Sequence, residues 1–255
     1  PIFPSRSFRH SAIYIRDDRG IAGPRDLAGR LVGVREFTMT AALVARGMLE
    51  DEFGLRSQDM RWCYGRADAT DDVPIARVLP RDVEIEKIGD DETLSDLLAE
   101  GRIDAMIAYK PPKAYVAGVP HVRRLFEDYP PLERDYYRRS GHFPIMHLIG
   151  VRRETLARDP GLAVRLCDAF QQALDYSQAR LLETQASYTM LPWNAAEAAR
   201  LKADFGPLWR YGFKDNLEAI RTLCRYSLAQ GIAARAVEPE ELFAPETIDW
   251  MAQAA

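Results

Sequence analysis

The sequence is poor in cysteine and histidine, the side chains on which many metal sites and disulfide scaffolds depend. It contains three cysteines, Cys63, Cys167 and Cys224, which are widely spaced and form no CxxC pair. An odd number of cysteines without short spacing argues against a disulfide framework and against a zinc ribbon. We expect them to be small buried hydrophobic residues in a reducing compartment, which indicates a cytoplasmic protein.

Long apolar runs and a strong charge of one sign are also missing. No stretch approaches the roughly 18 consecutive apolar residues of a membrane-spanning helix, so we expect no membrane partner. The formal net charge is −4, which disfavours general nucleic-acid binding. The chain shows neither an initiator methionine nor a basic, apolar leader. We therefore expect an upstream segment to be missing, and an export signal could have been lost with it.

Several motifs that define large enzyme classes do not occur. The chain has no HExxH, no DxDxDG loop, no GxSxG, no Walker loop and no GxGxxG. Their absence removes the signatures of zinc proteases, EF-hands, serine hydrolases, P-loop NTPases and Rossmann dinucleotide enzymes. We predict no metal, although a histidine and a glutamate could together ligate a single divalent ion.

Short apolar runs alternate with helical patterns, which predicts an α/β fold with mixed, mostly parallel sheets flanked by helices. The predicted strands are Ala12–Ile15, Leu31–Val34, Met60–Gly65, Val83–Ile88 and Ile103–Ala108. The first predicted helix takes Thr38 or Thr40 as its N-cap and ends at Gly54. Further helices are predicted over residues 91–100, 162–177, 195–205 and 217–230. Residues 125–137, which lie between two arginine pairs, are predicted to form an acidic, aromatic loop.

The stretch Pro4–Arg16 gathers anion-binding side chains directly before an apolar, β-branched run. These side chains are Arg6, Arg9, His10 and Ser11. Such a cluster leading into a buried strand predicts a ligand site held on a rigid element. A second run, Gly141–Arg152, carries His147 in a similar setting. We interpret the two runs as strands that cross between two lobes and line the cleft between them.

Two further segments are suited to bind an anion. Thr38, Met39 and Thr40 form the expected start of a helix, where unpaired N–H groups and the helix dipole favour negative charge. A capped helix with nothing bound is the alternative, because every α/β protein has such turns. Tyr109 and Lys110 follow a predicted buried strand, which is where open α/β sheets bind ligands.

Longer sequence patterns resemble a known fold and a known enzyme family. Ile21–Val34 and Leu94–Ala105 resemble segments of type II periplasmic-binding-protein folds. Narrower strings are similar to the 4,5-dihydroxyphthalate decarboxylase family over essentially the whole chain. They are Phe3–Tyr14, Thr93–Leu98, Tyr136–His147 and Trp209–Tyr226, with FPSRSFRHS and FPIMH the most specific.

The resemblance implies a two-lobed, type II periplasmic-binding-protein-like fold with a cleft between the lobes. Residues 1–15 are expected to end lobe one and to form the first crossover strand. Residues 16–142 are expected to form lobe two, and residues 143–255 the return crossover and the helical C-terminal part of lobe one. Against the family pattern the chain begins late, so the first part of lobe one is expected to be missing.

The resemblance also implies a carboxy-lyase reaction, in which 4,5-dihydroxyphthalate loses CO2 to give 3,4-dihydroxybenzoate. Arg6 and Arg9 are the expected anchors for the retained carboxylate. His10 or His147 is the expected acid that protonates the ring, and Glu36 is the expected acceptor for a ring hydroxyl. The other expected substrate-binding residues are Ser11, Thr38, Met39, Thr40, Tyr109 and Lys110. No organic cofactor is expected, because the ring hydroxyl itself supplies electrons.

Two other functions are compatible with the same patterns. One is a non-catalytic solute-binding protein that captures an aromatic acid on this fold. The other is an enzyme of the same family that acts on a different hydroxylated aromatic acid, or on a thiamine-pyrimidine-like precursor. The expected partner is a small aromatic carboxylate, and the sequence leaves a homo-oligomer open.

Overall fold

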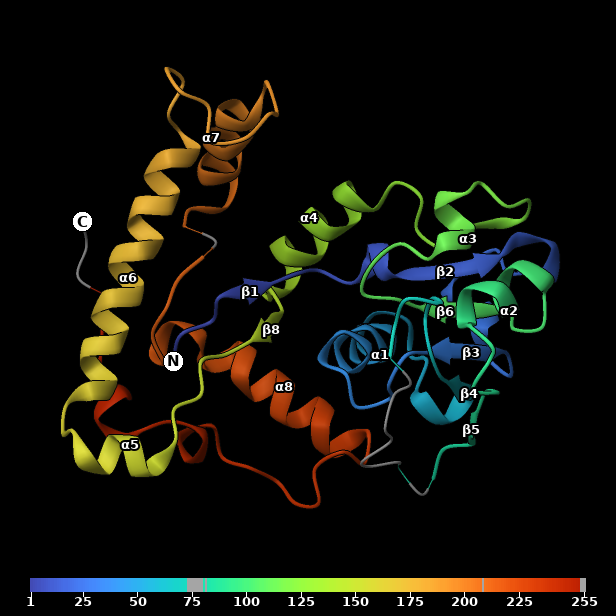
Figure 1. Cartoon of the computed structure of the whole chain (residues 1–255), viewed down its shortest axis with the longest axis horizontal. Coiled ribbons are helices and arrows are strands. Elements are labelled where there is room, and N and C mark those ends of the chain that lie inside the picture. Colours follow the sequence, from blue (N-terminus) through green and yellow to red (C-terminus); the bar gives the residue numbers. More distant parts are fainter. Residues whose placement is uncertain (73–79, 81, 208, 253–255) are drawn as a thin grey trace. The chain divides into compact units, whose positions relative to one another are not determined.

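The computed structural model describes residues 1–72, 80, 82–207 and 209–252 (Figure 1). The chain divides into two compact units, each assembled from separate stretches of sequence. The helical unit comprises residues 1–7, 140–221 and 237–255, and the sheet unit comprises residues 8–139 and 222–236.

The division differs from the predicted domain boundaries at residues 8–15, 140–142 and 222–236. Residues 8–15 lie in the sheet unit rather than with the other lobe, because strand β2 (Ile13–Arg16) pairs on both sides with strands of that unit. Residues 222–236 lie there as well. Tyr226 and Gln230 explain this placement, since both donate hydrogen bonds to groups on the first long helix of the unit.

Among the described residues, six strands of the sheet unit form one sheet in the order β5-β4-β3-β6-β2-β7. Besides β2, they are β3 (Leu31–Val34), β4 (Arg61–Tyr64), β5 (Ile85–Lys87), β6 (Ala105–Ile107) and β7 (Val122–Arg124). Strands β3 to β6 pair in parallel, whereas β2 runs antiparallel to both of its neighbours, β6 and β7. All five predicted strands are present, most of them shortened, and the mixed, mostly parallel α/β sheet is confirmed.

The two faces of the sheet pack against different helices (Figure 1). Ile13 and Ile15 belong to a buried cluster that includes residues of helix α1 (Thr40–Phe53). Tyr14, between them, belongs to a second cluster with residues of helix α2 (Leu94–Glu100). Successive strand residues point to opposite faces, so β2 is buried on both sides, as its unbroken apolar run predicts.

Helix α1 begins one residue away from either predicted N-cap. Met39 is the N-cap, and no side-chain hydrogen bond caps this end of the helix. The prediction of Thr38 or Thr40 is therefore wrong, because Met39 is still extended (φ −60°, ψ 133°) while Thr40 is already helical.

The predicted acidic loop over residues 125–137 is also wrong, since most of it forms helix α4 (Tyr129–Ser140). Pro130 and Pro131 lie in the first turn, where backbone N–H groups have no partner within a helix, so proline is tolerated there. Arg138 and Arg139 lie in the last turn, where the helix dipole favours positive charge. A short helix, α3 (Lys113–Val116), precedes β7.

A glycine on α1 allows the segment 222–236 to pack closely against this helix. A Cβ atom added to Gly47 would overlap with the Tyr226 ring, most closely with its Cε2 atom. That ring is held in place because the Tyr226 hydroxyl donates a hydrogen bond of 2.6 Å to Asp51 Oδ2. Arg225 contacts the same carboxylate through two hydrogen bonds, so the ring cannot shift without breaking these contacts.

We expect Gly47→Ala to lower the free energy of unfolding by about 1–2 kcal/mol, measured by urea denaturation. The overpacking against Tyr226 outweighs the gain in helix propensity. Gly23→Ala is the matched control, because nothing lies within 4 Å of its added Cβ, and it should change stability by less than about 0.5 kcal/mol. An alanine variant at residue 47 as stable as the wild type would contradict the proposed close packing.

The helical unit carries the remaining elements. They are β1 (Ser5–Arg6), β8 (Ile145–His147), α5 (Arg153–Arg158), α6 (Leu162–Leu181), α7 (Asn194–Phe205) and α8 (Leu217–Ala229), whose last part belongs to the sheet unit. Strands β1 and β8 pair antiparallel, with Ser5 opposite His147. The helical character predicted beyond Gly141 is confirmed. Within the described residues, no helix combines the length and apolarity that crossing a membrane requires.

Candidate functional site

The antiparallel strand β2 brings distant segments to one edge of the sheet. Strands β3, β4 and β6 end at this edge, and β2 begins there because it pairs antiparallel with β6. The Ala108 N–H donates a hydrogen bond of 2.9 Å to the Ala12 carbonyl, which fixes the two segments side by side. We call this the carboxyl edge, since ligands of open α/β sheets bind beyond the carboxyl ends of parallel strands.

The topology brings most of the predicted site residues to the carboxyl edge. They precede β2 or follow β3 and β6: Arg9, His10, Ser11, Glu36, Thr38, Met39, Thr40, Tyr109 and Lys110. Arg6 and His147 instead belong to the helical unit.

His10 lies in a 3₁₀ turn (His10–Ala12) immediately before β2 and is 3% exposed. The rings of Phe126 and Tyr136 pack edge-on against its imidazole. Its Nδ1 atom lies 3.9 Å from Oε1 of Glu133. Burial lowers the pKa of His10 to about 4, although the Glu52 carboxylate opposes this shift. The imidazole is therefore neutral at neutral pH.

Glu133 is the residue of this site that the sequence prediction missed. It lies on α4 and its side chain is 13% exposed. Its Oε1 atom accepts a long hydrogen bond of 3.4 Å from the Ser11 N–H. Burial raises the pKa of Glu133 to about 7, against the opposing effects of the Ser11 N–H and the charges of Arg9 and Arg124. A signal was present in the sequence, because prolines in a first turn and paired arginines in a last turn are typical of a helix.

Two cationic side chains flank this pair of titratable groups. Burial lowers the pKa of Arg9, and the Glu133 carboxylate opposes the shift. Arg124, at the end of β7, donates from Nε to the Ser11 carbonyl at 3.2 Å. Its other nitrogens donate to the hydroxyls of Tyr115 and Tyr14. Arg124 therefore holds the backbone that carries Ser11 in place.

A second charged cluster lies where β3 and β6 end. Lys110 Nζ is 3.1 Å from Asp71 Oδ1, and this carboxylate raises the pKa of Lys110. The Tyr109 hydroxyl donates to the same oxygen at 3.5 Å. Glu36 accepts a hydrogen bond of 3.1 Å from Arg35 NH1. The uncapped start of α1 follows Glu36 along the chain, so this region can bind an anion through backbone N–H groups.

Arg6 is held by groups of the helical unit. Its NH1 donates to the Phe143 carbonyl at 2.9 Å, and its NH2 donates to the Arg210 carbonyl at 3.3 Å and to Asn216 Oδ1. The residue is only 9% exposed. These contacts hold β1 against the loops around it, and the role of Arg6 as a substrate anchor stays a prediction. His147 is exposed on β8.

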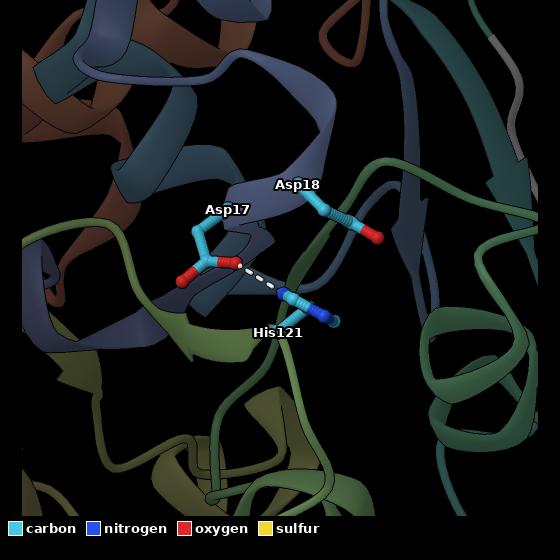
Figure 2. A group of neighbouring side chains, drawn as sticks. All are labelled: Asp17, Asp18 and His121. Carbon is cyan, nitrogen blue, oxygen red and sulfur yellow. Dashed lines mark hydrogen bonds and ion pairs between the residues drawn. The ribbon is translucent and has the colours of Figure 1, made fainter.

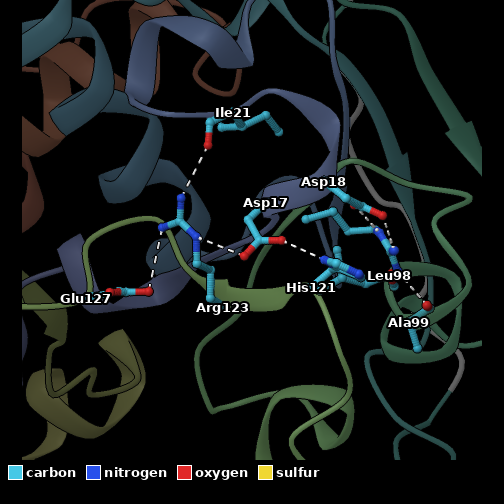
Figure 3. A network of polar contacts seen from close by, with 9 residues as sticks. Asp17, Asp18, Ile21, Leu98, Ala99, His121, Arg123 and Glu127 are labelled. Carbon is cyan, nitrogen blue, oxygen red and sulfur yellow. Dashed lines mark hydrogen bonds and ion pairs between the residues drawn. The ribbon is translucent and has the colours of Figure 1, made fainter.

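The described residues contain one group of three potential metal ligands, Asp17, Asp18 and His121, whose ligand atoms lie within 4.8 Å of one another (Figure 2). Figure 3 shows why this group does not favour a cation. Arg16 donates two hydrogen bonds to Asp18, and Arg123 lies 3.6 Å from Asp17. The group also follows β2 and precedes β7, so it lies at the sheet edge opposite to the carboxyl edge.

Comparisons of the sequence with known proteins identify two similar proteins that share one name. No family model matches the chain. It is 36% identical over 251 residues to 4,5-dihydroxyphthalate decarboxylase from Comamonas testosteroni, covering 98% of this chain and 76% of that protein. It is 42% identical over 139 residues to 4,5-dihydroxyphthalate decarboxylase from Pseudomonas putida, covering 54% of each chain.

Two solved structures are similar at lower identity. The periplasmic aliphatic sulphonate binding protein SsuA from Escherichia coli matches with a TM-score of 0.44 and 14% identity, covering 97% of this chain and 67% of that chain. The desulfurization enzyme DSZB matches with a TM-score of 0.41 and 17% identity, covering 93% of this chain and 74% of that chain.

Proposed function

Because this chain belongs to the 4,5-dihydroxyphthalate decarboxylase family, we propose that it converts 4,5-dihydroxyphthalate to 3,4-dihydroxybenzoate and CO2. The observation that carries this proposal is the match of 36% identity over 98% of the chain. The relatives are named as decarboxylases, which favours an enzyme over the alternative of a solute-binding protein.

The reaction replaces one ring carboxylate by a proton. The hydroxyl para to the departing carboxylate donates electron density into the ring, and a proton is added to the carbon that bears the carboxylate. The C–CO2 bond then breaks, its electron pair restores the aromatic ring, and CO2 leaves. Since the ring hydroxyl is the source of electrons, this chemistry calls for no organic cofactor.

The carboxyl edge offers groups that can bind the retained carboxylate and a ring hydroxyl of this substrate. Arg9, Lys110 and the start of α1 can bind the retained carboxylate, because guanidinium, ammonium and helix N–H groups all bind anions. Glu36 can accept a hydrogen bond from a ring hydroxyl, and Tyr109, which is 42% exposed, offers a ring face and a hydroxyl. His147 belongs to the helical unit, and its predicted role in proton transfer stays a prediction.

The proposal is tested by incubating the purified chain with 4,5-dihydroxyphthalate and measuring 3,4-dihydroxybenzoate by chromatography and CO2 release. In D2O the product should carry one deuterium at the vacated carbon, as ring protonation requires. Phthalate is the matched control, because it has both carboxylates but no hydroxyl, and it should not react. Binding of 4,5-dihydroxyphthalate without any turnover would instead support a solute-binding protein.

A further inference from the structure

Glu133 has an unusual setting for a carboxyl group on a helix. Its side chain is mostly buried beside the turn that starts β2, with Oε1 3.4 Å from the Ser11 nitrogen and 3.9 Å from His10 Nδ1. Two residues further along α4, Asp135 shows the ordinary arrangement, since its carboxylate is 60% exposed and pairs with Arg139 one turn away. Helix α4 therefore presents one carboxyl group to the carboxyl edge and another to solvent.

The other titratable groups of the carboxyl edge are poorly suited to deliver a proton at neutral pH. His10 is neutral, because burial holds its pKa at about 4. Lys110 is paired with Asp71, which raises the pKa of the ammonium group and holds its proton more tightly. The Oε1 atom of Glu36 is occupied by a hydrogen bond of 3.1 Å from the Arg35 guanidinium.

We propose that Glu133 is the proton donor of the decarboxylation, an inference that rests on the function proposed above. The Glu133 carboxyl group gives its proton to the ring carbon that bears the departing carboxylate. A new C–H bond forms, the C–CO2 bond breaks, and its electron pair returns to the ring. Glu133 is left as a carboxylate, which takes a proton from water before the next turnover.

The groups that face Glu133 support both of its protonation states. Desolvation favours the protonated acid, whose pKa is about 7, near the value at which a general acid is most effective. The carboxylate formed after proton transfer has the Ser11 N–H as a hydrogen-bond donor and the positive charges of Arg9 and Arg124 nearby. The neutral His10 imidazole completes this environment and adds no competing charge at neutral pH.

Glu133→Gln is the first test, since glutamine keeps the shape of the side chain but carries no transferable acid proton. We expect kcat with 4,5-dihydroxyphthalate to fall by about 10²-fold or more, with KM little changed. Asp135→Asn is the matched control on the same helix and should keep wild-type kcat. A Glu133→Gln variant with wild-type kcat, while the wild type is active, would overturn the role of Glu133 and leave the proposed function intact.

The pH profile separates a chemical role from a structural one. In the wild type kcat/KM should fall as the pH rises through about 7, because the reactive form is the protonated acid. In Glu133→Asp, kcat/KM should still fall with rising pH, but the midpoint of this fall should be shifted. This second variant also provides the test if Glu133→Gln does not fold. A fall in kcat/KM with the same midpoint in Glu133→Asp as in the wild type would overturn the role of Glu133 as proton donor. A wild type without any turnover would instead refute the proposed function.

Discussion

Gln230→Leu is expected to lower the free energy of unfolding by about 3 kcal/mol, because it removes one of the two hydrogen-bond acceptors of a buried charge. Arg46 is 1% exposed, and among the described residues no carboxylate pairs with it. Its Nε donates to Gln230 Oε1 at 2.7 Å, and its NH2 donates to the Phe37 carbonyl at 2.6 Å. Burial lowers the pKa of Arg46 to about 9, which shows how costly the charge is at this position.

The amide of Gln230 also donates to the Leu43 carbonyl at 3.0 Å, so its loss affects both α1 and the loop before it. That loop contains Phe37, whose ring lies 3.7 Å from the Arg46 guanidinium, and it precedes the predicted anion site at residues 38–40. A weaker contact between Phe37 and Arg46 should therefore also disturb residues 38–40 at the carboxyl edge.

Urea denaturation measures the effect, with Gln172→Leu as the matched control, because Gln172 is an exposed residue of α6. The control should change stability by less than about 0.5 kcal/mol. In the double variant Arg46→Met/Gln230→Leu both partners are removed, and we expect it to be more stable than Gln230→Leu alone. A double variant less stable than the single one would show that the buried charge is not the cause of the loss.

As the pH is lowered, His10 and Glu133 are expected to change the free energy of unfolding in opposite directions, each by about 3 kcal/mol at most. The pKa of His10 is lowered from 6.5 to about 4, so the unfolded chain binds its proton first and stability falls as the pH drops through this window. The pKa of Glu133 is raised from 4.5 to about 7. The folded chain therefore binds this proton first, and stability rises as the pH drops from about 7 to 4.5.

Variants separate the two contributions. We expect Glu133→Gln to lose stability more steeply than the wild type between pH 6.5 and 4, because only the His10 contribution remains. His10→Phe keeps an aromatic ring between Phe126 and Tyr136 and should lose stability less steeply than the wild type. The exposed Gln172 provides the control, since Gln172→Leu changes no titratable group and should follow the wild-type curve. If the free energy of unfolding changed with pH in the same way in the wild type, Glu133→Gln and His10→Phe, the opposing contributions of His10 and Glu133 would be ruled out.

The sequence predicted the elements of the sheet well because each strand carries a local signal. Runs such as Leu31–Val34 are apolar and β-branched, and the structure has the same bounds for that strand. Helix α4 was missed because its adjacent prolines were interpreted as a loop signal, although proline also occurs in the first turn of helices. Its first turn tolerates the prolines, and the buried Tyr136 holds it against the core.

The candidate site was predicted less completely, because a residue's chemistry depends on neighbours that are distant in sequence. His10 was expected to titrate near neutral pH, as histidine does in water. Phe126, Tyr136 and Glu133 surround it in the structure, and burial shifts its pKa far below that range. Arg6, the predicted substrate anchor, donates hydrogen bonds to carbonyls of the helical unit that lie far from it in sequence.

The sequence by itself determined the family, the α/β class and the short segments that carry charged side chains, since all of these are local patterns of residues. Only the tertiary structure decided which segments meet. The antiparallel insertion of β2 between β6 and β7 brings Arg9 and His10 to the edge where the parallel strands end. Helix α4 then adds Glu133, whose acidity is set by desolvation among side chains that no stretch of sequence contains together.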